Sequence, residues 1–192
     1  MKLCIVGNGT ITHPQGHIIN TMDTVIRLST YKIIGYEHMV GTKTDIVSVA
    51  RIENVSPDVK IWLGNIYGFG SIPIEIIKKA FPQGYFLPDV EMTQKIYAKY
   101  NTHPSLGSLT IWLAVMTGQF FYDKIYVTGF DFGHIGRPKY YYDPEILKGP
   151  VIGHDCANER MVLKTMIASG LVEFLDPRDI ILLEEGWSIQ TP

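Results

Sequence analysis

The chain has 192 residues, of which 46% are hydrophobic and 19% charged, and its formal net charge is −2 with an isoelectric point near 6.3. This composition excludes disorder, collagen-like repeats and a coiled coil as descriptions of the whole chain. The near-neutral charge supplies no broad cationic field, so nucleic acid is not an expected partner. The length predicts a single domain over residues 1–192.

Runs of apolar and β-branched residues alternate with helical patterns along the chain. The expected strands are residues 3–6, 24–28, 45–50, 59–63, 85–87, 124–128, 172–175 and 180–183. The expected helices are residues 73–80, 90–100, 109–116 and 155–168. This alternation predicts an α/β fold, in which a mostly parallel sheet is flanked by helices on both faces, as in Rossmann-like nucleotide-binding proteins.

Ligands of such sheets bind beyond the carboxyl ends of the strands. Residues 7–10, 29–44 and 129–136 should therefore lie on one rim of the sheet. Residues 133–153 are rich in Gly, Pro and Tyr without a clear period, so we expect a mobile loop over the site.

The first expected strand ends in Gly7-Asn8-Gly9. Glycines there let backbone amides approach a phosphate or a ribose, and Asn8 offers both a donor and an acceptor. A plain tight turn would use the same glycines, and this segment alone does not decide between the two. An NAD site is disfavoured because Thr12 replaces the third small residue of the dinucleotide fingerprint and Leu28-Ser29 lacks the acidic residue that binds a ribose.

No apolar run approaches the roughly 20 residues of a membrane-spanning helix, and the N-terminus lacks the features of a secretory signal. The two cysteines, Cys4 and Cys156, are too few for a disulfide scaffold, and neither they nor the scattered histidines have the spacing of a metal site. We therefore expect a cytoplasmic protein without a transmembrane segment or a bound metal ion.

Four segments, in order, resemble the sialyl motifs of animal-type sialyltransferases, which are glycosyltransferase family 29. Residues 4–9, 23–28 and 41–44 resemble the long motif, and residues 103–107 to 123–131 the short motif. The third motif is matched by Tyr140-Tyr141-Tyr142-Asp143, and the His-x4-Glu motif by His154 with Glu159. The resemblance implies inverting, metal-independent transfer of sialic acid from a CMP-sugar to a glycan hydroxyl, with no cofactor besides this donor substrate.

The resemblance also implies which residues bind the nucleotide: Gly7, Asn8, Gly9, Ser29, Ser105, Leu106, Gly107 and Tyr140. Ser29 stands where the family usually has a second Asn, which puts one nucleotide contact in doubt. A helix that begins near Ser105 would direct its N–H groups and its positive dipole end toward a phosphate. A plain Ser N-cap is the alternative explanation of this segment.

By the same resemblance, His154 is the expected general base, because a neutral imidazole can accept the proton of the attacking hydroxyl. A surface or capping role is the alternative. Glu159 is expected to order its helix or a neighbouring loop rather than to share the proton. Tyr141 is assigned to the leaving phosphate, with Tyr140 as the other candidate, although the aromatic run would also suit packing of the loop. We expect Arg27 to stabilise the site through a carboxylate such as Asp23 or Asp45.

The chain departs from the family in two further respects. Cys4 matches one half of the family's disulfide, but Tyr122 stands at the other position, so no disulfide is expected. At 192 residues we expect neither the stem nor the membrane anchor of Golgi enzymes, which favours a bacterial or viral type acting on a glycan or glycolipid acceptor. Peripheral membrane contact stays open. The alternatives are a CMP-Kdo transferase, a catalytically idle nucleotide-binding module and an NAD-type oxidoreductase.

Overall fold

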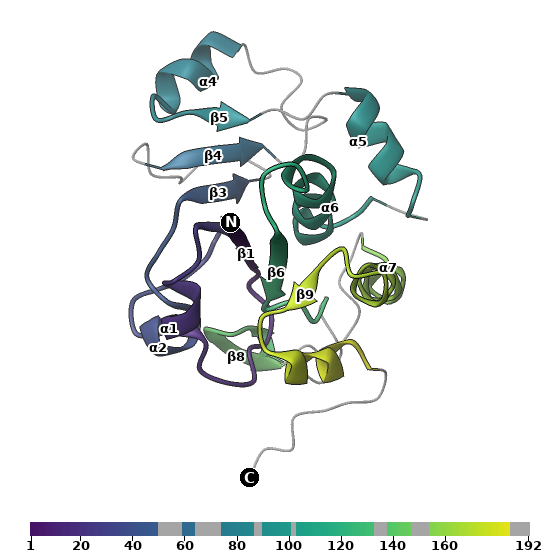
Figure 1. Cartoon of the computed structure of the whole chain (residues 1–192). Helices are drawn as coiled ribbons and strands as arrows, with labels where there is room; N and C mark the ends of the chain where they lie inside the picture. Colours follow the sequence, from purple (N-terminus) through teal and green to yellow (C-terminus); the bar gives the residue numbers. More distant parts are fainter. Residues whose placement is uncertain are drawn as a thin grey trace.

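The computed structural model describes residues 1–49, 59–63, 74–86, 90–100, 103–132, 138–146 and 154–184. Its main feature is a seven-stranded sheet with the order β5-β4-β3-β2-β1-β6-β9, in which every neighbouring pair is parallel (Figure 1). The strands are β1 (Lys2–Val6), β2 (Thr24–Leu28), β3 (Ile46–Val49), β4 (Lys60–Leu63), β5 (Tyr85–Phe86), β6 (Lys124–Thr128) and β9 (Glu173–Phe174). The expected parallel sheet is confirmed.

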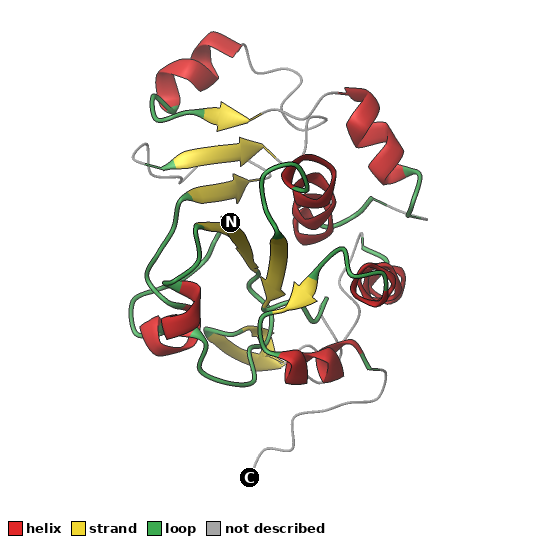
Figure 2. Ribbon diagram, in the orientation of Figure 1, coloured by secondary structure: helices red, strands yellow, loops and turns green. Residues whose placement is uncertain are grey.

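Helices cover both faces of this sheet (Figures 1 and 2). One face carries α1 (Gly16–Ile19), α2 (Glu37–Val40) and α4 (Ile74–Ala80), and the other carries α5 (Val90–Tyr97), α6 (Leu106–Gly118) and α7 (Cys156–Ala168). The central strand shows why: Leu3 and Ile5 pack in the cluster beneath α6, whereas Cys4 and Val6 pack beneath α1 and α2. Successive side chains of a strand point to opposite faces, so an uninterrupted apolar strand needs cover on both.

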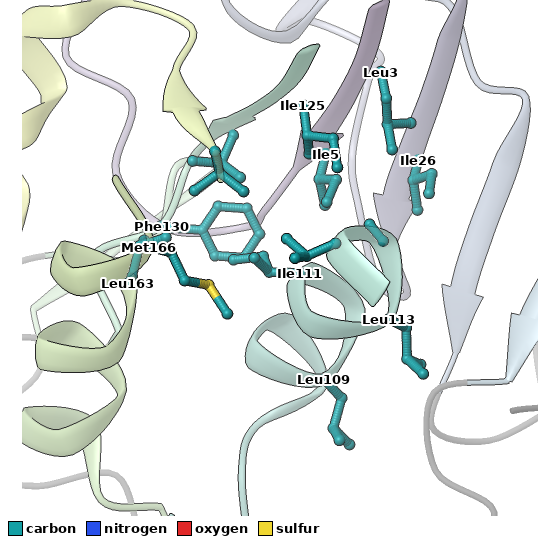
Figure 3. Packing of buried hydrophobic residues seen from close by; sticks show 14 of the residues in the cluster. Leu3, Ile5, Ile26, Leu109, Ile111, Leu113, Ile125, Phe130, Leu163 and Met166 are labelled. Atoms are coloured by element: carbon teal, nitrogen blue, oxygen red, sulfur yellow. The ribbon is translucent and has the colours of Figure 1, made fainter. Parts of the chain in front are cut away.

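The largest part of the core lies between the sheet and α6. Leu109, Ile111 and Leu113 of α6 are buried, and Figure 3 shows them beside side chains from the central strands and α7. Because α6 is buried on nearly every side, its sequence is apolar all round rather than amphipathic. Each fully buried aliphatic side chain of this kind contributes about 1.5–3 kcal/mol to folding.

Residues 138–146 form an antiparallel hairpin of β7 (Pro138–Tyr140) and β8 (Asp143–Ile146). The turn of this hairpin is fixed to the end of β1, because Tyr141 N donates to Asn8 O at 2.9 Å. These residues therefore form a docked hairpin with half-buried tyrosines and not an irregular loop; the mobility expected for them stays a prediction. The rest of the expected loop, residues 133–137 and 147–153, lies outside the described residues.

The expected strand at residues 180–183 is also wrong, since it belongs to the 3-10 helix η1 (Pro177–Leu183). Asp176 caps this helix by accepting the Arg178 N–H at 3.0 Å, and Pro177 occupies its first turn. In this helix Leu182 and Leu183 are buried, whereas Ile180 and Ile181 are exposed. A short apolar run does not by its composition distinguish a strand from a helix. Within the described residues, no helix is long and apolar enough to cross a membrane.

Candidate active site

A cavity of about 660 Å³ opens at the carboxyl ends of β1, β2 and β6. The chain builds the sheet outward from β1 to β5 and then returns to place β6 on the other side of β1. The strand order thus reverses between the neighbouring strands β1 and β6. Parallel sheets bind ligands at such a topological switch point, beyond the carboxyl ends of the two strands. The expected rim is confirmed, because residues 8–9, 28–30 and 129–132 all line this cavity.

Most of the residues that the sequence assigned to the site line the cavity. They are Asn8, Gly9, Ser29, Ser105, Leu106, Gly107, Tyr140, His154 and Glu159. Gly7 and Tyr141 are not among the lining residues. At Gly7 the backbones of β1 and β6 approach so closely that an added Cβ would lie 2.2 Å from the carbonyl oxygen of Gly129. Gly7 therefore serves the tight turn, while Asn8 and Gly9 reach the cavity.

The amide of Asn8 is oriented by its neighbours. Its Nδ2 donates to Ser29 O at 2.8 Å and to Thr30 Oγ1 at 3.2 Å, and a carbonyl oxygen can only accept, which fixes the orientation of the amide. Its Oδ1 is buried and has no hydrogen-bond partner within the described part of the chain. The Oδ1 atom of Asn8 is therefore available as an acceptor, and a ligand group that binds it must be a hydrogen-bond donor.

Backbone strain is concentrated around the cavity. Two described residues other than glycine have a positive φ, Thr30 at 69° and Phe132 at 50°, and both line the cavity. Thr30 is held in this conformation by Asn8 and by the hydroxyl of Tyr142, which donates to Thr30 O at 2.7 Å. A positive φ at a residue other than glycine costs about 1–3 kcal/mol of stability, and such strained conformations are common at functional sites.

Glu159 joins the first turns of two helices. This carboxylate is 2% exposed; its Oε1 accepts the Ser105 N–H at 2.8 Å, and its Oε2 accepts the hydroxyls of Ser105 at 2.5 Å and Ser108 at 2.6 Å. A carboxylate is favourable here because the N-terminus of α6 is the positive end of its dipole. Glu159 thus orders the start of α6. Because Ser105 gives both of its donors to Glu159, the N–H groups left to face a ligand are those of Leu106 and Gly107.

His154 lines the same cavity from the segment that precedes α7. Its Nδ1 lies 3.3 Å from the carbonyl oxygen of His103 and 3.8 Å from Oε1 of Glu159. Both neighbouring atoms are acceptors, so Nδ1 is the ring nitrogen that donates to them. The side chain is 36% exposed. With Nδ1 directed at these two acceptors, Nε2 is the ring nitrogen left to contact a ligand in the cavity.

The tyrosines of the hairpin separate into two environments. Tyr140 lines the cavity and stacks on Tyr142 with ring centroids 5.1 Å apart. Tyr141 packs against Tyr36, and its hydroxyl donates to the carbonyl oxygen of Lys32. Burial raises the pKa of the Tyr141 phenol. Of the two tyrosines considered for the leaving phosphate, the structure therefore brings Tyr140 to the cavity and leaves Tyr141 outside it.

No carboxylate of the described residues accepts a hydrogen bond from Arg27, and neither Asp23 nor Asp45 binds it, so that expectation is wrong. Its guanidinium is fully buried, and burial lowers its pKa. It donates to the backbone carbonyl oxygens of Val40, Gly41 and Lys43 and to the hydroxyl of Thr44. The carboxylates of Asp23 and Asp45 instead accept backbone N–H groups at the starts of β1 and β2. Arg27 fixes the loop that follows α2 and does not line the cavity.

Sequence reasoning placed Thr30 and residues 130–132 on the expected rim without giving them a role, and it missed Lys139 and Cys156, which also line the cavity. Asp131 lies in the short-motif match and is 2% exposed, and it accepts the Thr10 N–H at 2.9 Å. Lys139 directly precedes the third motif, so its position in the chain was a usable signal.

Both cysteines are free, as expected. Among the residues that the structure describes, no group of three His, Cys, Asp or Glu side chains is placed to hold a metal ion.

Residues 1–56 match the sequence model of glycosyltransferase family 29 (sialyltransferase). A comparison with curated protein sequences found no match. Among solved structures, a mammalian sialyltransferase in complex with Gal-beta-1-3GalNAc-ortho-nitrophenol is similar, with a TM-score of 0.62 and 15% identity over 90% of this chain and 68% of that chain. The sialyltransferase CstII from Campylobacter jejuni, in complex with the substrate analogue CMP-3FNeuAc, has a TM-score of 0.55 and 15% identity over 90% and 79% of the two chains.

The resemblance to the sialyltransferases of family 29 is confirmed. The family match covers β1, β2 and β3 with the cavity residues that follow the first two strands. The likeness to the solved sialyltransferases extends the shared fold over most of the chain. Together, the sialyltransferase match and the sialyltransferase fold support a CMP-sugar-dependent glycosyltransferase.

Proposed function

We propose that this protein transfers sialic acid, or a related 2-keto sugar acid, from its CMP conjugate to a glycan hydroxyl, with inversion and without a metal ion. The observation that carries the proposal is the position of His154. Its Nδ1 is directed to the carbonyl oxygen of His103, and it shares a cavity with Asn8 and the first turn of α6. The match to the sialyltransferase family supports the choice of a CMP-sugar as donor.

In this reaction Nε2 of His154 accepts the proton of the acceptor hydroxyl while its oxygen attacks the anomeric carbon. The new bond forms as the bond from that carbon to the phosphate oxygen breaks, and CMP leaves with the bonding electron pair. A single displacement of this kind inverts the anomeric centre. Glu159 acts as a positioning residue, because its carboxylate lies 3.8 Å from Nδ1 of His154 and also fixes Ser105.

Binding of the nucleotide would use groups that the fold leaves unpaired. The N–H groups of Leu106 and Gly107 and the positive end of the α6 dipole suit a phosphate. Oδ1 of Asn8 is an acceptor and suits a hydroxyl of the ribose rather than a phosphate oxygen. The phenol of Tyr140 would donate a hydrogen bond to the phosphate as it leaves.

The test is CMP release from CMP-sialic acid, measured with a panel of galactoside acceptors in the presence of a metal chelator. We expect transfer that the chelator does not abolish. The variant His154→Ala should lower kcat by about 10²- to 10⁴-fold and bind CMP as the wild type does. The control is His17→Ala, because His17 is exposed on α1 and does not line the cavity.

Two results would count against the proposal. Normal turnover of His154→Ala would remove the general base. CMP binding without donor cleavage under any acceptor would favour a catalytically idle nucleotide-binding module. CMP-Kdo, offered as the donor in parallel, tests which 2-keto sugar acid the cavity prefers.

A further inference from the structure

The described residues that line the cavity include two carboxylates but only one lysine. Two carboxylates line it, those of Asp131 and Glu159, and both are 2% exposed. The other titratable side chains among the described lining residues are His154, Tyr140, Cys156 and Lys139. A CMP-sugar acid is itself anionic at its phosphate and at its carboxylate. A ligand of this kind needs a cation nearby, because buried carboxylates oppose its approach.

Two other cations in and beside β2 are committed elsewhere. Arg27 is buried and donates to backbone carbonyl oxygens of the loop after α2. Lys43 donates to Met22 O at 2.6 Å and lies 3.7 Å from the carboxylate of Asp45. Neither side chain lines the cavity.

Lys139 differs from both. It lies in β7, lines the cavity and is exposed, and its ammonium sits 5.5 Å from the ring centroid of Tyr140. Across the described ranges of the chain, no carboxylate lies within ion-pair distance of this ammonium. The stacked rings of Tyr140 and Tyr142 support the side chain from one side. Lys139 is therefore a cation at the cavity that has no anionic partner among the described residues.

We propose that Lys139 is a specificity-determining residue that contacts the anionic part of the donor, its phosphate or the carboxylate of its sugar. This inference rests on the proposed function and adds a residue that the motifs do not include. An ammonium that reaches an anion makes a charge-assisted hydrogen bond, which is stronger than a neutral one. Lys139 would thereby offset the two buried carboxylates and make the cavity prefer charged nucleotides over neutral nucleosides.

The experiment compares three ligands by isothermal titration calorimetry: cytidine, CMP and CMP-3FNeuAc. The proteins are the wild type, Lys139→Met, which keeps the length of the side chain without its charge, and Lys139→Arg, which keeps the charge. The matched control is Lys95→Met, since Lys95 is an exposed lysine of α5 that pairs with Glu91.

We expect Lys139→Met to bind cytidine with unchanged affinity and to bind at least one of the anionic ligands roughly tenfold more weakly. Lys139→Arg and Lys95→Met should stay within about twofold of the wild type. Weaker binding of CMP would assign the contact to the phosphate. Weaker binding of CMP-3FNeuAc alone would assign it to the carboxylate of the sugar.

The inference is overturned if Lys139→Met binds all three ligands like the wild type, or if its affinity for cytidine falls as much as its affinity for CMP. In both cases a wild type that binds CMP leaves the proposed function standing. A wild type that binds neither CMP nor CMP-3FNeuAc would overturn the proposed function, and the role of Lys139 with it.

Discussion

The carboxylate of Glu159 accepts the backbone N–H of Ser105 at 2.8 Å, which ties the first turn of α7 to the N-cap of α6. The two residues are 54 positions apart in the chain. Through this contact the segment that carries His154 and the segment that presents Leu106 and Gly107 to the cavity are fixed relative to each other. The geometry of the proposed reaction depends on this connection.

The substitution Glu159→Gln tests the connection. The amide keeps one acceptor but puts an NH2 group where three donors converge, so it should lower the free energy of unfolding by about 1–3 kcal/mol. Urea denaturation measures this change. The control is Glu173→Gln, which alters an exposed ion pair with Lys124 and should cost less than about 1 kcal/mol. Equal losses in the two variants would show that the buried carboxylate has no special role.

The two tyrosines of the hairpin are expected to respond differently to loss of the hydroxyl. Tyr140→Phe should lower kcat by about 10²-fold, because it removes a donor from the leaving phosphate. Tyr141→Phe should lower the free energy of unfolding by about 1 kcal/mol and leave kcat nearly unchanged, because its hydroxyl bonds to Lys32 away from the cavity. Steady-state kinetics and denaturation of both variants separate the roles. The reverse pattern would restore the assignment of Tyr141 to the phosphate.

Cys156 provides a chemical probe of the cavity. It lines the cavity and is partly exposed, whereas Cys4 is fully buried and burial raises the pKa of its thiol to about 12. We expect iodoacetamide to modify the folded protein at Cys156. Burial raises the pKa of this thiol as well, and only the thiolate reacts, so the rate should increase as the pH rises. Saturating CMP should slow the modification, as measured by mass spectrometry. An unchanged rate in the presence of CMP would mean that the nucleotide binds elsewhere.

Asp179 should give the protein a specific pH dependence. This side chain is fully buried and accepts hydrogen bonds from Thr12 and Gln15, and burial raises its pKa above the ordinary value of 3.8. A raised pKa means that the folded state binds the proton more tightly than the unfolded state does. The associated stability is therefore complete below pH 3.8 and is lost as the pH rises through the higher pKa of the folded state.

The substitution Asp179→Asn removes this titration. Relative to the wild type, its free energy of unfolding should increase as the pH is raised from below 3.8 to neutral. Urea denaturation of both proteins across this range measures the difference. A difference that stays constant with pH would contradict a raised pKa at Asp179.

The fold was predictable where a local pattern determines it. Apolar runs of strand length marked every strand of the main sheet, and the position of Asn8, Ser29 and Asp131 just after three of these strands placed them on one rim. A Pro and an acidic cap, rather than the apolar run, decided the structure of residues 177–183. The four-residue helices α1 and α2 are too short to show a helical period, so they could not be predicted from the pattern of apolar residues.

Contacts between distant segments were harder to predict. The motifs named Tyr140 and Tyr141 as alternatives, but which one faces the cavity depends on how the hairpin docks on the end of β1. Tyr140 is the last residue of β7 and Tyr141 is the first residue of the turn, so the two neighbours have different surroundings once the hairpin has formed. Arg27 was expected to bind a carboxylate because its charge suggests one, whereas backbone carbonyl oxygens converge on it only in the folded chain.

The most direct test of the account is a crystal structure of the protein with CMP-3FNeuAc. We expect the nucleotide in the cavity at the ends of β1 and β6, with its phosphate at the N–H groups of Leu106 and Gly107. The anomeric carbon should face Nε2 of His154. A nucleotide bound at another surface, or an imidazole of His154 turned away from the sugar, would contradict the account.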